Sequence, residues 1–294
     1  MDIFLDYYHP YAGLCNQLYL ITNHLVDAIN LNKKIYINKV NIDIFKKNRI
    51  NACDFFDLVK TSENIKKLTG KDIILFEKPI NFTIPKLCIY PVNSIEILNC
   101  LEFQEKFLNL SLSVKEFNAI HFRLELDAII HYLFSTKVYD DFMNKCNNNS
   151  LSKDFIKKFM ELSEVKDYIN FLLKQYFDFI LKISNNASSW YICTLIGKKE
   201  IHDCLLPILK MLTDFIESLN GNIIKNEQYF EERELNALVD LLNLRDCTKM
   251  IGFEGSSYSE GYAYKVNSIR NCVKEYYFVN GIVNKISDEL YESC

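Results

Sequence analysis

Short apolar segments alternate along this chain with longer segments in which apolar residues recur at helical spacing. The short segments read as β-strands, and they are Asp2–Tyr7, Lys34–Asn38, Asp72–Phe76, Leu87–Tyr90, Asn118–Leu124, Ser189–Leu195, Asn222–Lys225 and Lys249–Phe253. Strands that are separated by helices pair in parallel, because a helical crossover returns the chain to the same end of the sheet. The sequence therefore predicts a fold of the α/β class.

The longer segments carry the helical pattern. In the first of them, apolar residues fall on one helical stripe, namely Leu14, Leu18, Ile21, Leu25 and Ile29. The others are Leu151–Ile183, Ile201–Leu219 and Glu231–Leu244. The first of these three is long enough for two helices and is expected to be a helical insertion. Its composition favours core packing, and a module that binds another protein is the alternative.

The domain organisation follows from length and composition. With 294 residues the chain is long enough for two domains. It contains only eight glycines and five prolines, and no flexible linker marks a boundary. We expect an N-terminal domain of residues 1–113 and a C-terminal domain of residues 114–270. Residues 271–294 are expected to form a C-terminal segment that packs back on the first domain.

The charge pattern bears on the partners. The net charge is −4 and no block of lysine and arginine stands out, so the broad basic surface that nucleic-acid binding requires is missing. The N-terminal residues lack the pattern of a signal peptide, and no run of about 18 apolar residues suggests a membrane span. We therefore expect a cytoplasmic protein without a transmembrane segment.

The ten cysteines are scattered, and no two of them form a Cys-x-x-Cys pair. Zinc sites and redox motifs need such local clustering. The sequence thus favours free thiols over disulfides and predicts no metal site.

The first segment with chemical potential runs from Gly13 to Leu18, with Asn16 and Gln17 in its middle. It follows a strand and begins a helix. A glycine at such a turn lets the backbone approach a ligand, and the N-terminus of a helix offers N–H groups to an anion. The two amides suit a polyhydroxyl ligand. An ordinary helix cap is the alternative.

The second segment, 119–127, alternates apolar and ionisable residues. If it is extended, His121, Arg123, Glu125 and Asp127 lie on one side of a strand. A buried parallel strand is ordinarily apolar on both faces, and ligands bind beyond the carboxyl ends of such strands. The pattern indicates a binding site, and an edge strand with a solvated face is the alternative.

The third segment, 252–259, follows an apolar strand and contains Gly252, Gly255, Ser256, Ser257 and Ser259. Glycines and hydroxyls that lead into a helix can form a phosphate cradle. A plain loop with an N-cap serine is the alternative.

The order of these segments resembles the GT-B fucosyltransferase superfamily. Residues 121–127 are similar to the His-Leu-Arg-Phe-Glu-x-Asp signature of plant-type O-fucosyltransferases. Residues 237–240, together with Ile251, Gly252 and residues 256–258, are similar to the donor-binding end of protein O-fucosyltransferases. The resemblance departs at Gly13, where some relatives carry arginine. It implies two facing Rossmann-like domains with parallel sheets.

The resemblance also implies roles for individual residues. Arg123 would bind the diphosphate of a nucleotide sugar and Asp240 its base. Ser256, Ser257 and the backbone of Tyr258 would hold phosphate, while Asn16 would lie near the sugar. The remaining donor-binding positions implied are Gly13, His121 and Thr194.

The implied activity is transfer of a sugar with inversion, most simply fucose from GDP-fucose, to a hydroxyl of a glycan or protein. The chain has no Asp-x-Asp pair, so Arg123 rather than a metal would stabilise the leaving diphosphate. Asp127 is the favoured general base over Glu125, and either carboxylate could instead orient Arg123 or His121. The alternatives are a transferase for another GDP- or UDP-sugar and a nucleotide-sugar-binding protein without catalysis.

Overall fold

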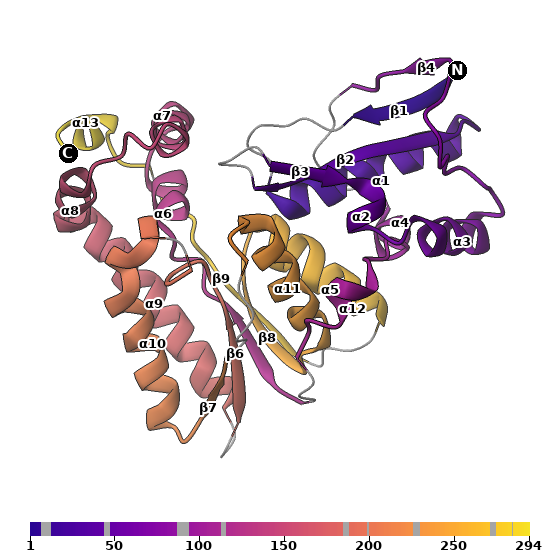
Figure 1. Cartoon of the computed structure of the whole chain (residues 1–294). Helices are drawn as coiled ribbons and strands as arrows, with labels where there is room; N and C mark the ends of the chain where they lie inside the picture. Colours follow the sequence, from indigo (N-terminus) through magenta and orange to yellow (C-terminus); the bar gives the residue numbers. More distant parts are fainter. Residues whose placement is uncertain are drawn as a thin grey trace. The chain divides into compact units, whose positions relative to one another are not determined.

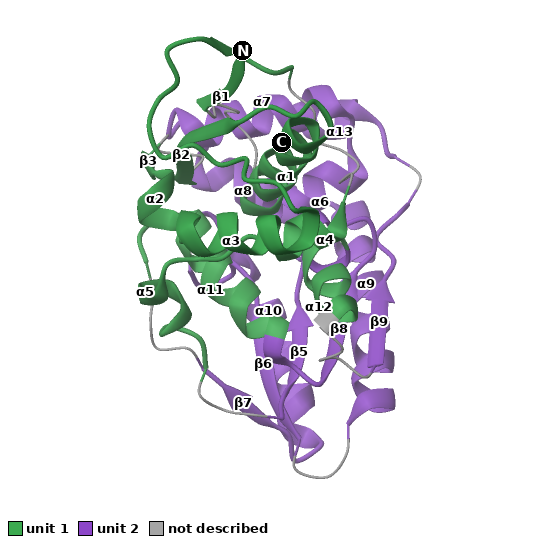
Figure 2. Cartoon of the chain, turned by 90° about the vertical axis from the view of Figure 1, so that its right-hand side faces the viewer, with its two compact units in different colours: residues 1–113, 228–245, 261–271 green, residues 114–227, 246–260, 272–294 purple. Residues whose placement is uncertain are grey.

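The structure is a computed structural model, and Figure 1 shows it for the whole chain. It describes residues 1–6, 13–43, 48–86, 94–112, 116–184, 188–198, 200–225, 230–270, 275–283 and 285–294. The chain forms two compact units, which Figure 2 colours separately. Unit 1 comprises residues 1–113, 228–245 and 261–271, and unit 2 comprises residues 114–227, 246–260 and 272–294. Residues 228–245 and 261–270, which we expected in the second domain, thus cluster with unit 1.

Unit 1 contains a four-stranded sheet in the order β3-β2-β1-β4. Its strands are β1 (Asp2–Asp6), β2 (Ile35–Asp43), β3 (Asn48–Asn51) and β4 (Phe82–Thr83). Strand β1 pairs in parallel with β2 and β4, whereas β3 pairs with β2 in the antiparallel sense. The sheet is mixed because β2 and β3 follow each other without a helical crossover.

The helices of unit 1 are α1 (Leu14–Asn30), α2 (Ala52–Phe55), α3 (Leu58–Thr69), α4 (Ile95–Asn99), α5 (Glu105–Leu108), α11 (Arg233–Asp246) and α12 (Lys265–Arg270). Helix α3 has standard end signals, because Asp57 accepts a hydrogen bond from the N–H of Lys60 and Gly70 ends the helix at φ +74°. Phe55, Phe56 and Phe103 pack ring against ring in the core.

Unit 2 contains a five-stranded sheet in the order β7-β6-β5-β8-β9. Its strands are β5 (Asn118–His121), β6 (Ser189–Cys193), β7 (Asn222–Ile224), β8 (Lys249–Phe253) and β9 (Glu275–Val279), and every pairing is parallel. Counted along the chain within this unit, the order is 3-2-1-4-5. Such a sheet is doubly wound, and the direction of winding switches between β5 and β8.

The helices of unit 2 are α6 (Leu126–Leu133), α7 (Thr136–Asn147), α8 (Lys153–Glu161), α9 (Ser163–Ile183), the 3₁₀ helix η1 (Glu200–Leu205), α10 (Leu206–Ser218) and α13 (Asp288–Glu292). A π-helical segment, η2 (Ser257–Tyr264), follows β8. Helices α9 and α10 lie along one face of the sheet (Figure 1). Helix α9 buries one apolar stripe, including Leu172 and Ile180, as core packing requires.

The α/β class is confirmed, and the sheet of unit 2 is parallel as expected, whereas the antiparallel strand β3 makes the sheet of unit 1 mixed. The expected helical pair in 151–183 is present as α8 and α9. The strand expected at Asn118–Leu124 is wrong in extent, because β5 ends at His121 and α6 begins at Leu126. At 72–76 only an isolated parallel bridge between Ile74 and Ile35 forms. The strand expected at 87–90 lies outside the described residues.

The C-terminal segment lies in unit 2. The ammonium group of Lys285 donates to the backbone oxygens of His131 and Phe134 at the end of α6. A cation is favourable there, because the last carbonyls of a helix have no helical partners. Asp288 accepts a hydrogen bond from the N–H of Ser135 at the start of α7. We had expected this segment to pack on the first domain, whereas these contacts are all with unit 2.

Candidate functional site

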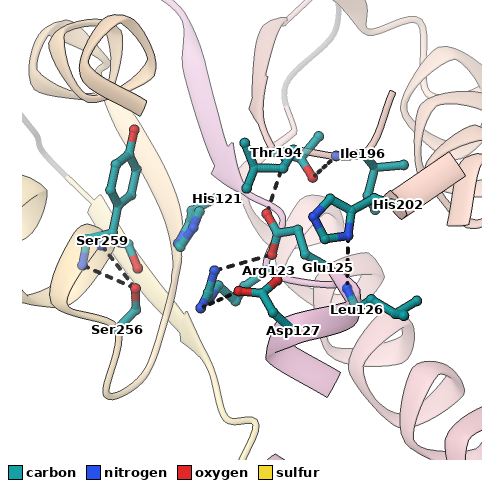
Figure 3. A network of polar contacts seen from close by, with 12 residues as sticks. His121, Arg123, Glu125, Leu126, Asp127, Thr194, Ile196, His202, Ser256 and Ser259 are labelled. Atoms are coloured by element: carbon teal, nitrogen blue, oxygen red, sulfur yellow. Dashed lines mark hydrogen bonds and ion pairs between the residues drawn. The ribbon is translucent and has the colours of Figure 1, made fainter. Parts of the chain in front are cut away.

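The candidate site lies at the carboxyl edge of the unit 2 sheet. Strands β5, β6 and β8 are neighbours and parallel, so the residues that follow them emerge at the same edge. Figure 3 shows the polar side chains there, which come from the end of β5, from α6 and from the turns after β6 and β8. Ligands of doubly wound sheets bind at this edge, beside the switch point.

The backbone at the end of β5 is held by one side chain, Tyr176 of α9. Its hydroxyl donates to the carbonyl of His121 at 2.7 Å and accepts from the N–H of Arg123 at 3.0 Å. Its ring packs edge-on against Phe122 with the ring centroids 5.0 Å apart. This contact satisfies two backbone groups where β5 stops pairing, and it fixes the direction in which Arg123 leaves the strand.

Arg123 is the cation of the site. Its side chain is 25% exposed, and its guanidinium lies 3.5 Å from Glu125 and 3.9 Å from Asp127 (Figure 3). Burial disfavours the charged form, but the carboxylates of Asp127 and Glu125 outweigh it and raise the pKa of Arg123 above its ordinary value. Among described residues only the 3.5 Å contact is a hydrogen bond. The fork therefore keeps N–H donors for a bound group.

The two carboxylates occupy different local structures. Glu125 is 2% exposed, and its second oxygen accepts a hydrogen bond of 3.3 Å from the N–H of Leu195 after β6. Burial raises the pKa of Glu125, which the charge of Arg123 opposes and that of Asp127 reinforces. Asp127 is buried in the first turn of α6. The two side chains thus flank Arg123 even though residues 122–125 are not a strand.

His202 caps the same helix. Its Nδ1 accepts a hydrogen bond of 3.2 Å from the N–H of Leu126, the first residue of α6. An accepting Nδ1 carries no proton, so the neutral ring is protonated at Nε2. His202 therefore holds the start of α6 in place, and with it the 121–127 segment, from outside that segment.

His121 is buried, and its Nδ1 has no hydrogen-bond partner within the described part of the chain. Its ring lies 4.9 Å from that of Tyr258, tilted by 40°. Burial and then the charge of Arg123 hold the pKa of His121 well below its ordinary value, so the imidazole is neutral. A neutral imidazole can both donate and accept a hydrogen bond.

The turn after β8 is closed by its own side chains. Ser256 Oγ accepts from the N–H groups of Tyr258 at 3.2 Å and Ser259 at 3.4 Å, as an N-cap does (Figure 3). Glu260 accepts a 2.6 Å hydrogen bond from the N–H of Gly255, which stands at φ +72°. Ser256 therefore acts as an N-cap, which was the alternative to a phosphate cradle. The roles of Ser256, Ser257 and Tyr258 in binding phosphate stay predictions.

Thr194 follows β6 at the same edge. It is buried, and its hydroxyl accepts a 3.3 Å hydrogen bond from the N–H of Ile196. The preceding Cys193 lies 3.5 Å from the phenol oxygen of Tyr258, sulfur to oxygen. The end of β6 is thus linked to the turn after β8.

Gly13 precedes α1 in unit 1. Its φ of −59° does not require glycine, and a Cβ there would make only ordinary contacts, at 3.7 Å or more. The N–H of Leu14 donates to Glu234 of α11 at 2.6 Å, and Arg233 pairs with the same carboxylate at 2.9 Å. The N-terminus of α1 that we expected to bind a ligand anion is thus occupied by a carboxylate of the protein itself.

The two amides after Gly13 differ. Gln17 exchanges hydrogen bonds of 3.0 and 2.9 Å with the backbone of Asn41 in β2, so its predicted contact with a ligand is replaced by an internal one. Asn16 Oδ1 is buried and has no hydrogen-bond partner among the residues the structure describes. Asp240 of α11 is buried, with 4% of its surface exposed.

The structure thus brings together at one edge of unit 2 the predicted residues His121, Arg123, Glu125, Asp127, Thr194 and Ser256 (Figure 3). Tyr258 contacts His121 and Cys193 at the same edge, and Ser257 precedes it in the turn after β8. Gly13, Asn16 and Asp240 belong to unit 1. The sequence analysis missed Tyr176, His202, Glu234 and Glu260. Tyr176, His202 and Glu234 contact backbone groups that lie 53, 76 and 220 positions away, and no local motif signals such contacts. Glu260 contacts the N–H of Gly255 within its own turn.

Over the described ranges, no group of three or more His, Cys, Asp or Glu side chains is arranged to hold a metal ion. Among the helices that the structure describes, none is long and apolar enough to cross a membrane. The chain matches no protein-family model, and it matches no curated protein.

Proposed function

We propose that this protein is a glycosyltransferase of the GT-B type that transfers a sugar from a nucleoside diphosphate to a hydroxyl group of a glycan or protein. Fucose from GDP-fucose is the donor we favour, with inversion at the anomeric carbon and without a metal ion. The proposal takes unit 2 as the Rossmann-like donor domain and unit 1 as the second domain of the pair.

The observation that carries the proposal is the position of Arg123. A guanidinium with available donors lies at the carboxyl edge of a doubly wound sheet, beside its switch point. Such a fork can grip two oxygens of a diphosphate at once, which an ammonium group cannot. The turn after β8 adds the Ser256 hydroxyl at the neighbouring strand end.

The transfer step that we propose balances as follows. The acceptor oxygen forms a bond to the anomeric carbon, the bond from that carbon to the diphosphate breaks, and Arg123 stabilises the charge that the diphosphate takes away. The acceptor proton passes to a carboxylate. We assign it to Asp127, because both oxygens of Glu125 are engaged, by Arg123 and by the N–H of Leu195. Glu125 is then a positioning residue.

The supporting residues suit the same reading. Neutral His121 would donate to phosphate without adding charge, and Thr194 would border the nucleotide pocket. Asn16 and Asp240, in unit 1, would contact the sugar and the base, as the resemblance implies. A transferase for another GDP- or UDP-sugar shares every one of these features, and so does a nucleotide-sugar-binding protein without catalysis.

A panel of nucleotide sugars and their nucleoside diphosphates tests the proposal. A ligand that binds only the folded state raises the melting temperature by mass action. We expect stabilisation by GDP-fucose and GDP, its loss in Arg123→Ala, and little recovery in Arg123→Lys. Arg49→Ala, which removes an exposed arginine from β3 in unit 1, is the control.

Release of free sugar or its transfer to an acceptor distinguishes a transferase from a binding protein. If no nucleoside diphosphate or nucleotide sugar stabilises the wild-type protein, the proposal is wrong. If only UDP-sugars stabilise it, the protein is still assigned to the nucleotide-sugar transferases, and GDP-fucose is rejected as the donor.

A further inference from the structure

Tyr132 of α6 is a phenol at the candidate site that no motif singled out. Its ring lies 5.2 Å from that of Phe253, the last residue of β8, tilted by 45°. Burial raises the pKa of its hydroxyl, the charge of Arg123 opposes this, and the carboxylates of Asp127 and Glu260 reinforce it. The ring therefore packs against the end of β8, at the carboxyl edge of the sheet where the candidate site lies.

The hydroxyl of Tyr132 makes no hydrogen bond to any of the described residues, although its ring is half-buried. Other tyrosine hydroxyls of this unit do have hydrogen-bond partners. Tyr168 donates to the carbonyl of Gly281, and Tyr176 bonds with two backbone groups. A buried tyrosine usually finds a partner for its hydroxyl. The O–H of Tyr132 is thus a donor that the fold itself does not use.

The charge at the site makes such a donor useful. Arg123 contributes one positive charge, and Glu125 and Asp127 stand against it within 3.9 Å. The group as a whole is therefore a weak electrostatic attractor for a diphosphate. Neutral donors add hydrogen bonds to an anion without requiring a further buried cation, and hydrogen bonds to charged acceptors are stronger than neutral ones.

We propose that Tyr132 is a further donor-binding residue, whose hydroxyl donates a hydrogen bond to a phosphate oxygen of the diphosphate that Arg123 binds. The inference rests on the proposed function and assigns this part of the site to a side chain outside the recognised motifs. It makes the first helix after β5, as well as the strand end, a part of the phosphate-binding surface.

The test is Tyr132→Phe, which removes one oxygen and keeps the ring on Phe253. Calorimetric titration with GDP, UDP and guanosine separates the phosphate contact from a contact with the base. We expect roughly tenfold weaker binding of both diphosphates, the scale of one hydrogen bond to a charged group, and no change for guanosine. Tyr291→Phe is the control, because its hydroxyl contacts Asp141 at 3.4 Å on α7.

The outcomes separate this inference from the proposed function. If Tyr132→Phe binds GDP and UDP like the wild type while Arg123→Ala has lost both, the inference is overturned and the proposed function stands. An equal loss for guanosine also overturns it, since ring packing rather than phosphate would then be affected. A wild-type protein that binds neither diphosphate overturns both.

Discussion

The carboxylate of Glu260 and the backbone N–H of Gly255 form a 2.6 Å hydrogen bond in the turn after β8. A carboxylate of the protein thus occupies one of the N–H groups that a phosphate would use. We predict that Glu260→Gln binds GDP about threefold to tenfold more tightly, because a weaker and uncharged acceptor is easier to displace. Calorimetric titration with GDP measures the change.

Glu254→Gln is the matched control for that variant, since it removes a negative charge from an exposed position of the same turn. An equal gain in both variants would attribute the effect to overall charge and not to the Gly255 contact.

Tyr176→Phe is expected to affect both stability and ligand binding. It removes two buried hydrogen bonds, to the carbonyl of His121 and from the N–H of Arg123. We predict a loss of about 1–3 kcal/mol in the free energy of unfolding, the range for buried groups left without a partner. Urea unfolding measures it, and GDP affinity should fall as Arg123 shifts.

Tyr168→Phe provides the comparison, because its hydroxyl binds the carbonyl of Gly281 and does not hold the end of β5. It should lose stability and keep GDP affinity. Equal affinities in the two variants would show that Tyr176 does not position Arg123.

His121 predicts a pH dependence of stability. Its pKa is lowered in the folded protein, so below the ordinary value of 6.5 the unfolded chain binds a proton that the folded protein does not. Stability then falls as the pH is lowered from 6.5 towards the folded pKa, by about 1.4 kcal/mol per pH unit at full effect. Denaturant titrations between pH 7 and pH 5 should show a shallower slope in His121→Gln.

His24→Gln is the comparison for the same window. His24 is buried in α1, and its pKa is also lowered by burial, but Asp27 opposes the shift. Its removal should flatten the slope less. A His121→Gln profile parallel to that of the wild type would contradict a neutral buried His121.

Glu234→Ala is expected to destabilise unit 1. The variant removes the acceptor of the Leu14 N–H at the start of α1 and leaves Arg233, only 12% exposed, without this carboxylate. We predict a loss of about 1–3 kcal/mol by urea unfolding. Asp57→Ala, which removes the cap of α3, should cost less because Asp57 is more exposed. The reverse order would show that Glu234 is not needed to hold α1.

Asp240→Asn tests the base-reading role. A carboxylate can accept two N–H bonds from guanine, and uracil offers no such pair. The variant should bind GDP about 1–3 kcal/mol more weakly and leave UDP unchanged, whereas Ser257→Ala should weaken both. Because Asp240 is 4% exposed, circular dichroism must first show an intact fold. Unchanged GDP affinity would remove the preference for a guanine donor.

The sequence predicted the class of the fold because its signals are local. Lys249–Phe253 and Ser189–Cys193 are short apolar runs between helices, and both are parallel strands. The end of the strand in segment 119–127 was predicted wrongly because a strand pattern and a helix pattern overlap there. Its polar residues alternate as in a strand, yet Leu126, Ile129, Ile130 and Leu133 have the spacing of a helix, and the helix prevails.

From the sequence, only the part of the site that lies within short motifs could be predicted. Arg123 and the carboxylates beside it are close in sequence, so one segment revealed them. The contact of Leu14 with Glu234 spans 220 positions, and that of Arg123 with Tyr176 spans 53. Such pairs depend on how the chain returns on itself, which periodicity and motif spacing do not encode. Strand β9 was missed for the same reason, since its pairing with β8 makes it a strand.

The strands of unit 2 come from separate stretches of the chain: β5 to β7 from residues 114–227, β8 from residues 246–260 and β9 from residues 272–294. During synthesis on the ribosome, one edge of β5 therefore remains unpaired until β8 has been made. An unpaired strand edge can template pairing with other chains, and nascent chains are vulnerable in this way. A polypeptide stalled after residue 227 exposes to its neighbours the side of β5 that pairs with β8 in the finished protein.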